Sequence, residues 1–271
     1  MGRKRDPPFF AYYSTILTHI PVVPTPHNKQ LTTTPQEKFA GMLRYADHLI
    51  DRLTKALEEL SLRKNTVVFI TVDNGTDNGS DQKAYQSLGG RINGRISGEG
   101  IYSLTERGIN VPLIVNCPAL VAQGSSSNNL VAASDILPTL AELAGAKLPL
   151  VRIDGQSFAP HLLGRTPAQP DRPWCFSQYY KTRVVRDLRY KLYSSGQFYD
   201  LSEEPLEQHN LKSRKPTTNE EDLLALKQLQ GVLDSLPDNA KLPWGFRSIS
   251  ARKIRARRTT AAKKQRKPSG N

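Results

Sequence analysis

The chain has 271 residues, which is enough to bury a sizeable core, and its composition is that of a globular protein apart from a formal net charge of +13. Ten Lys or Arg residues and no Asp or Glu lie from Arg247 to Asn271, so the rest of the chain carries only +3 of that charge. Two cysteines exclude a disulfide framework, and no segment approaches the roughly 20 apolar residues of a membrane span.

In chain order, the first predicted element is a short apolar strand at residues 9–14, followed by a polar loop that carries His19. The sequence Thr34-Pro35-Gln36-Glu37 then has the pattern of a capping box with proline at the first helical position. Apolar residues recur after it with a period of 3.6, from Phe39 to Leu60. The pattern predicts a long amphipathic helix.

Two further runs predict buried strands, at residues 66–72 and 111–116. The first is apolar without alternation, which is typical of a strand covered on both faces in a parallel sheet. A helix, a strand and a polar loop in succession indicate an α/β fold, so we expect a mostly parallel central sheet flanked by helices. Another helix is predicted over residues 135–143, with Ser134 as its cap and Gly145 as its stop.

The C-terminal part has a different pattern. Residues 183–186, 190–193 and 197–200 are predicted as short strands separated by turn residues, which together indicate a smaller antiparallel meander. A last amphipathic helix is predicted at about residues 220–236. We therefore expect an α/β domain over residues 1–170, a sheet-and-helix subdomain over residues 171–246, and a basic, disordered tail over residues 247–271.

Asp73-Asn74-Gly75 follows the strand at residues 66–72 and raises a question about function. Ligands of α/β sheets bind beyond the carboxyl ends of the strands, and hard divalent cations prefer carboxylate and carbonyl oxygens. The same tripeptide is also a good turn, because Asn and Asp tolerate left-handed backbone angles and Gly prefers them. On these three residues alone, the turn is the favoured interpretation.

The neighbouring segments favour the metal site. LTKALEELSLRKNTVVFITVDNG, residues 53–75, resembles the segment of the sulfatase family, in the alkaline-phosphatase-like superfamily, that ends in its metal-binding Asp-Asn-Gly. SLTERGINVPLIVNCP, residues 103–118, resembles a second family signature, and PFFAYYSTILTHIPVVPTP resembles the strand and loop with the family's substrate-site histidine. The resemblance runs in order from about Pro7 to Leu211, as the C-terminal part of an arylsulfatase-type enzyme.

This resemblance implies hydrolysis of sulfuric esters, either aryl sulfates or the sulfate groups of carbohydrates and sulfated polysaccharides. It implies that Asp73 and Asn74 are ligands of one divalent metal ion, which by the family resemblance is Ca²⁺. It also implies that His19 is a catalytic and substrate-binding residue that contacts the sulfate. The chemistry would combine electrostatic stabilisation of the transition state with metal assistance. Family members are usually exported, and the segment before Pro7 has no apolar run typical of a signal peptide, so the compartment stays open.

The sequence departs from the family pattern at two places. It contains no Cys/Ser-x-Pro-x-Arg motif, which in the family supplies the formylglycine nucleophile, and it lacks the preceding strand with paired aspartates. We therefore expect an N-terminally incomplete chain without turnover on its own. The position of the family's substrate-binding lysine is occupied by Ile101 or, with an insertion, Glu99; Lys83 and Arg91 are weak candidates to replace it.

Two rival functions stay open. One is a phosphodiesterase or phosphatase of the same superfamily, because phosphate and sulfate esters share shape and in-line displacement. The other is a degenerate, non-catalytic protein that binds anions, either sulfated polysaccharide or nucleic acid, through the basic tail. The absence of aromatic residues among the tail's charges disfavours nucleic acid and favours a solvated tail. We expect no membrane partner.

Overall fold

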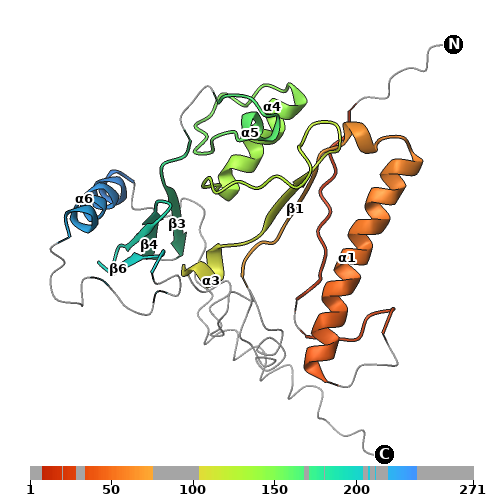
Figure 1. Cartoon of the computed structure of the whole chain (residues 1–271), viewed down its shortest axis with the longest axis horizontal. Coiled ribbons are helices and arrows are strands. Elements are labelled where there is room, and N and C mark those ends of the chain that lie inside the picture. The colour runs from red at the N-terminus through yellow and green to blue at the C-terminus, as the bar shows by residue number, and fades with distance from the viewer. Residues whose placement is uncertain are drawn as a thin grey trace, which may run out of the picture. The chain divides into compact units, whose positions relative to one another are not determined.

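The computed structural model describes residues 8–19, 21–28, 34–75, 104–167, 171–179, 181–203, 207, 211 and 219–236. Figure 1 shows the elements in this part of the chain, from the long helix α1 to the C-terminal strands and α6. The chain divides into two units, residues 1–235 and residues 236–271. The predicted domain boundaries at residues 170 and 246 stay predictions, and the basic tail lies outside the described residues.

Helix α1 spans Pro35–Glu59 and confirms the capping-box prediction. The Thr34 hydroxyl accepts a hydrogen bond from the backbone N–H of Glu37, and the Glu37 carboxylate accepts one from the N–H of Thr34. The two side chains thus satisfy two N–H groups at the start of the helix. Phe39, Met42 and Leu57 are buried along the helix, as the 3.6-residue period predicts.

Strands β1 (Val68–Thr71) and β2 (Leu113–Asn116) pair in an antiparallel register, with Val68 opposite Asn116 and Thr71 opposite Leu113. This pairing corrects only the expectation that the strand at residues 66–72 has a parallel neighbour; the strand pairs in the described part of the chain are antiparallel. The prediction that the two strands are buried is also wrong, since every residue of β1 and β2 is at least partly exposed. An apolar run contains no information about the direction of the neighbouring strand. The 3₁₀ turn η1 (Arg63–Asn65) leads into β1, and the four-residue helix α3 (Glu106–Ile109) precedes β2.

The strand predicted at residues 9–14 is also wrong, since the structure has irregular backbone there. The side chains of Phe9, Phe10, Tyr12 and Tyr13 are exposed. A run of residues with high β propensity becomes a strand only when a neighbouring strand satisfies its backbone groups. Within the described ranges, no strand lies beside this segment.

The region after β2 contains η3 (Ala133–Asp135), α4 (Ile136–Ala144) and α5 (Ala159–Leu162). Gly145 ends α4 at a φ of 64°, as predicted, because a left-handed C-cap favours glycine. The predicted cap at Ser134 is displaced by one residue to Asp135, whose buried carboxylate accepts the N–H groups of Ala132 and Gln156 and pairs with Arg172. Asp135 thus connects the start of α4 to the backbone at residues 132 and 156 and to the Arg172 side chain.

The C-terminal sheet has the order β3-β4-β5-β6 and is antiparallel throughout. Its strands span Cys175–Tyr179, Thr182–Arg186, Tyr190–Tyr193 and Phe198–Asp200, so the predicted meander is confirmed with one additional strand, β3. Helix α6 (Glu220–Ser235) covers one face of the sheet. The smaller C-terminal antiparallel sheet of the predicted α/β fold is therefore present.

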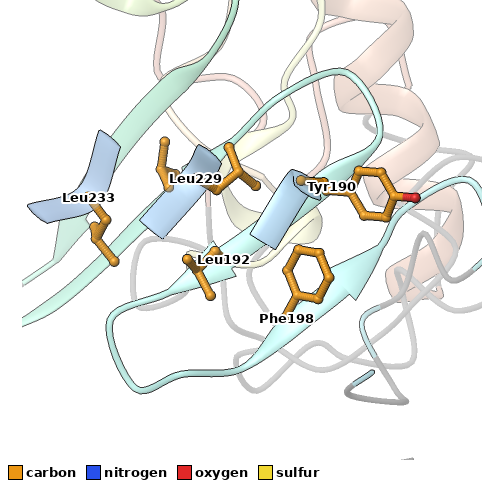
Figure 2. Packing of buried hydrophobic residues seen from close by; sticks show 7 residues of the cluster. Tyr190, Leu192, Phe198, Leu229 and Leu233 are labelled. Carbon is orange, nitrogen blue, oxygen red and sulfur yellow. The ribbon is translucent and has the colours of Figure 1, made fainter. Parts of the chain in front are cut away.

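The alternation of the strands gives this sheet two buried faces. One face, with Tyr190, Leu192 and Phe198, packs on Leu229 and Leu233 of α6, as Figure 2 shows. The other face packs on Leu104 beside α3, and its apolar residues are Val184, Tyr193, Tyr199 and Leu201. None of the helices in the described ranges combines the length and the apolar character that a membrane crossing needs.

Candidate active site

The corner that follows β1 consists of Asp73, Asn74 and Gly75. The Asp73 side chain is exposed and its Oδ1 accepts a hydrogen bond of 3.0 Å from the N–H of Asn74. Asn74 is half-buried, and its Nδ2 donates to the Gly75 carbonyl at 2.8 Å. Each side chain therefore stabilises the turn with one atom, and Asp73 Oδ2 and Asn74 Oδ1 make no hydrogen bond to another described residue.

Residues 73–75 can therefore form this turn and still offer one oxygen from each side chain to a metal ion. A carboxylate oxygen beside a carboxamide oxygen is the donor chemistry that Ca²⁺ prefers, but such ions take six to eight oxygens. No group of three or more His, Cys, Asp or Glu side chains suited to a metal ion occurs among the described residues. The oxygen atoms of Asp73 and Asn74 are of the type that a hard divalent cation binds, and further oxygens are required to complete its coordination.

The backbone ties this corner to the segment that leads into β2. The Gly75 N–H donates to the carbonyl of Gly108 in α3 at 2.9 Å. The Thr71 hydroxyl, at the end of β1, donates to the Pro112 carbonyl at 2.9 Å. The corner at Asp73 and Asn74 is therefore tied both to α3 and to the segment between α3 and β2.

The structure does not join His19 to this corner through any described hydrogen bond, ion pair or ring contact. His19 is exposed in the loop after residue 16, where its N–H donates to the Ile16 carbonyl at 2.9 Å. The chain that follows packs on α1, since Asn28 occupies the space that a side chain at Gly41 would fill. The role of His19 stays a prediction.

Other predicted site residues lie outside the described residues. They are Lys83 and Arg91, together with the alternative lysine positions Glu99 and Ile101. Their contribution to sulfate binding stays a prediction. Asp73 and Asn74 are therefore the two predicted site residues that the structure brings together.

A cluster of buried charges holds α3 and was not predicted as functional. Glu106 Oε1 lies 3.0 Å from Lys191 Nζ, and Glu106 Oε2 lies 2.5 Å from Arg186 Nη1. Glu207 Oε1 also pairs with Lys191 Nζ, at 2.9 Å, and the Tyr193 hydroxyl donates to the other oxygen of Glu207. We call these five residues the α3 anchor.

Burial sets the electrostatics of the α3 anchor. The Lys191 side chain has no exposed surface, and those of Glu106 and Glu207 are 11% and 2% exposed. Desolvation opposes the ionisation of Glu106, but the charges of Lys191 and Arg186 outweigh it and hold its pKa below the ordinary value of 4.5. Desolvation and the Glu207 carboxylate raise the pKa of Tyr193.

One signal in the sequence could have located this cluster. Lys191 stands between Tyr190 and Leu192 in an apolar strand, and a lysine is rarely fully buried unless it is paired. Glu106 belongs to the quoted segment SLTERG, but nothing in the sequence pairs it with a residue 85 positions later. Such a long-range pair becomes visible only in the folded chain.

Comparison with known proteins assigns the family. The sequence matches the family described as Sulfatase over residues 2–146 and the family described as N-sulphoglucosamine sulphohydrolase, C-terminal, over residues 102–232. The chain belongs to the sulfatase family. The predicted resemblance is thereby confirmed.

Individual relatives agree with this assignment. Human arylsulfatase A is 30% identical over 260 residues, covering 84% of this chain and 49% of the relative. Mouse N-acetylgalactosamine-6-sulfatase is 31% identical over 160 residues, covering 59% of this chain and 29% of the relative. The chain thus spans at most about half the length of these relatives.

Solved sulfatase structures have the same fold. A 2-O GAG sulfatase superposes with a TM-score of 0.55 and 27% identity, covering 73% of this chain and 42% of the other. A protein of glycosaminoglycan metabolism from Bacteroides thetaiotaomicron superposes with a TM-score of 0.66 and 25% identity, covering 82% and 48%. These matches confirm the predicted α/β fold class of the alkaline-phosphatase-like type.

Proposed function

We propose that this chain contributes the metal-binding and substrate-facing part of a sulfate-ester hydrolase site. The observation that supports this most directly is the corner after β1, where Asp73 Oδ2 and Asn74 Oδ1 make no hydrogen bond to another described residue, in a segment that matches the sulfatase family. A divalent cation, Ca²⁺ in this proposal, would neutralise the charge of the bound sulfate and of the transition state. The rest of the proposal concerns the chain's own groups.

Asp73 would supply the negative charge that attracts the cation, and Asn74 would supply a neutral carbonyl oxygen beside it. The hydrogen bonds within residues 73–75 hold the two side chains in one turn, so little conformational freedom is lost when the cation binds. His19 would donate a hydrogen bond to a sulfate oxygen or to the leaving group. Lys83 and Arg91 are weaker candidates for further charge neutralisation.

The proposed substrate is a sulfated sugar or polysaccharide in preference to a nucleic acid. Relatives and structural neighbours include an N-acetylgalactosamine-6-sulfatase and a 2-O GAG sulfatase. Because the sequence has no Cys/Ser-x-Pro-x-Arg motif, we propose that the nucleophile is not supplied by these 271 residues. Binding, and not turnover, is therefore the property to measure on this chain.

Calorimetric titration of the full chain with Ca²⁺ tests the proposal. We expect a dissociation constant on the order of millimolar, because two protein oxygens make a weak site. Asp73→Asn keeps an oxygen that can accept the N–H of Asn74 but removes the charge, so it should weaken binding about tenfold or more. The matched control is Asp51→Asn, which removes an exposed carboxylate paired with Lys55 on α1. Equal affinities for Asp73→Asn and Asp51→Asn would contradict the proposal.

A further inference from the structure

Helix α3 connects two features that are separate in the sequence. On one side, the Gly108 carbonyl accepts the N–H of Gly75 at 2.9 Å, which ties α3 to the proposed metal-binding corner. On the other side, Glu106 belongs to the α3 anchor and pairs with Lys191 and Arg186 of the C-terminal sheet. A four-residue helix has no intrinsic stability, so its position is set by these contacts.

The contacts of Glu106 fix the helix at both the backbone and the side chain. The Glu106 N–H donates to Glu207 Oε1 at 2.7 Å, and Asn110 Nδ2 donates to Glu106 Oε2 at 3.1 Å. Tyr193 Oη lies 3.1 Å from the Leu104 carbonyl, immediately before the helix. The residues around α3 are therefore held from 104 to 110 by one charged cluster.

Such a cluster is a poor means of stabilisation but a specific means of placement. Desolvation of a buried ion pair offsets much of its attraction, and apolar residues of similar size often stabilise as much. Charge-assisted hydrogen bonds, by contrast, fix both distance and direction. The α3 anchor satisfies the buried charges of Glu106, Glu207 and Lys191 in one arrangement.

We propose that Glu106, Glu207 and Lys191 are positioning residues for the corner at Asp73 and Asn74, acting through α3 and the hydrogen bond between Gly75 and Gly108. The C-terminal sheet thereby controls the geometry of the proposed cation site without contributing a ligand. The part of this inference that concerns cation affinity rests on the proposed function. The part that concerns placement of the corner does not.

Hydrogen exchange of individual amides, measured by NMR on the full chain, tests the placement. Glu207→Gln weakens the anchor, and we expect the Gly75 amide to lose protection about tenfold while the Leu229 amide in α6 keeps its own. Asp222→Asn is the matched control, because Asp222 is also a buried carboxylate that accepts a tyrosine hydroxyl from β5, at 2.8 Å from Tyr190, but on the α6 side of the sheet. This control should leave Gly75 unchanged.

A second pair of variants keeps the inference testable if Glu207→Gln fails to fold. Tyr193→Phe and Tyr190→Phe each remove one hydroxyl from β5, and each leaves every charge in place. Loss of Gly75 protection only in Tyr193→Phe would support the inference. An unchanged Gly75 amide in both anchor variants, or equal losses in the anchor variants and their controls, would overturn it.

The two proposals can fail separately. Amide exchange requires no cation, so a chain that binds no Ca²⁺ but shows the expected exchange would remove the proposed function and leave the placement intact. Normal Ca²⁺ binding with an unaffected Gly75 amide would do the reverse.

Discussion

The C-terminal sheet and the β1–β2 pair are both antiparallel, yet they differ in burial. Every residue of β5 and β6 is buried, and the sheet is covered by α6 on one face and by residues beside α3 on the other. In β1 and β2 every residue is at least partly exposed, and the Ile114 side chain is 55% exposed. The same secondary structure thus has two different environments in one chain.

This difference in burial places most of the buried core in the C-terminal sheet and the candidate site beside the more exposed β1–β2 pair. The C-terminal sheet contains the buried apolar cluster and the buried charges that support a fixed geometry. The β1–β2 pair ends in Asp73 and Asn74, whose exposed or half-buried oxygens suit a ligand. We infer that the well-buried C-terminal sheet holds in place the more exposed region that contains the candidate site.

The largest expected effect is on a core residue of the C-terminal sheet. Leu192 is fully buried, so Leu192→Ala should lower the free energy of unfolding by about 2–5 kcal/mol through lost burial and a residual cavity. Ile114→Ala, on the exposed side of β2, should lower it by only about 0.5 kcal/mol. Denaturant unfolding of the two variants measures this directly, and equal losses would remove the contrast between the regions.

A smaller effect on the free energy of unfolding is expected when the pH is lowered. The pKa of Glu106 is lowered in the folded chain, so the unfolded chain takes up this proton first as the pH falls. The stability that the Glu106 charge contributes is present above pH 4.5 and is lost as the pH falls through the lower folded pKa. The stability difference between wild type and Glu106→Gln should therefore be constant above this range and shrink below it.

Denaturant unfolding at several pH values between 3 and 7 would check this prediction. The difference between wild type and Leu192→Ala, which removes no titratable group, serves as the control and should stay nearly constant. A Glu106→Gln difference that stays equally constant would show that the Glu106 charge gains no interaction in the folded chain.

The sequence predicted the elements whose causes are local. The capping box at Thr34 and Glu37 and the left-handed stop at Gly145 are short-range effects, and both helices end or begin where these residues place them. The meander followed from short strand-like segments separated by turn residues. Local backbone preferences were sufficient for these features.

Features that depend on distant neighbours were beyond the sequence. The direction of β2 beside β1 and the absence of a strand at residues 9–14 depend on which strands lie next to them. The corner at Asp73 and Asn74 was predicted from motif resemblance, but the α3 anchor joins residues from three separate segments. Only the folded chain shows that Lys191 lies within reach of Glu106 and Glu207.

The most direct test of the central claim is an NMR titration of the ¹⁵N-labelled full chain with Ca²⁺. We predict that the amide signals of Asn74 and Gly75 shift first and furthest, followed by that of Gly108, because the cation binds at the corner that α3 holds. The acidic start of α6, with Glu220, Glu221 and Asp222, provides an internal competitor for nonspecific binding. Shifts concentrated there, with the signals of Asn74 and Gly75 unmoved, would contradict the account.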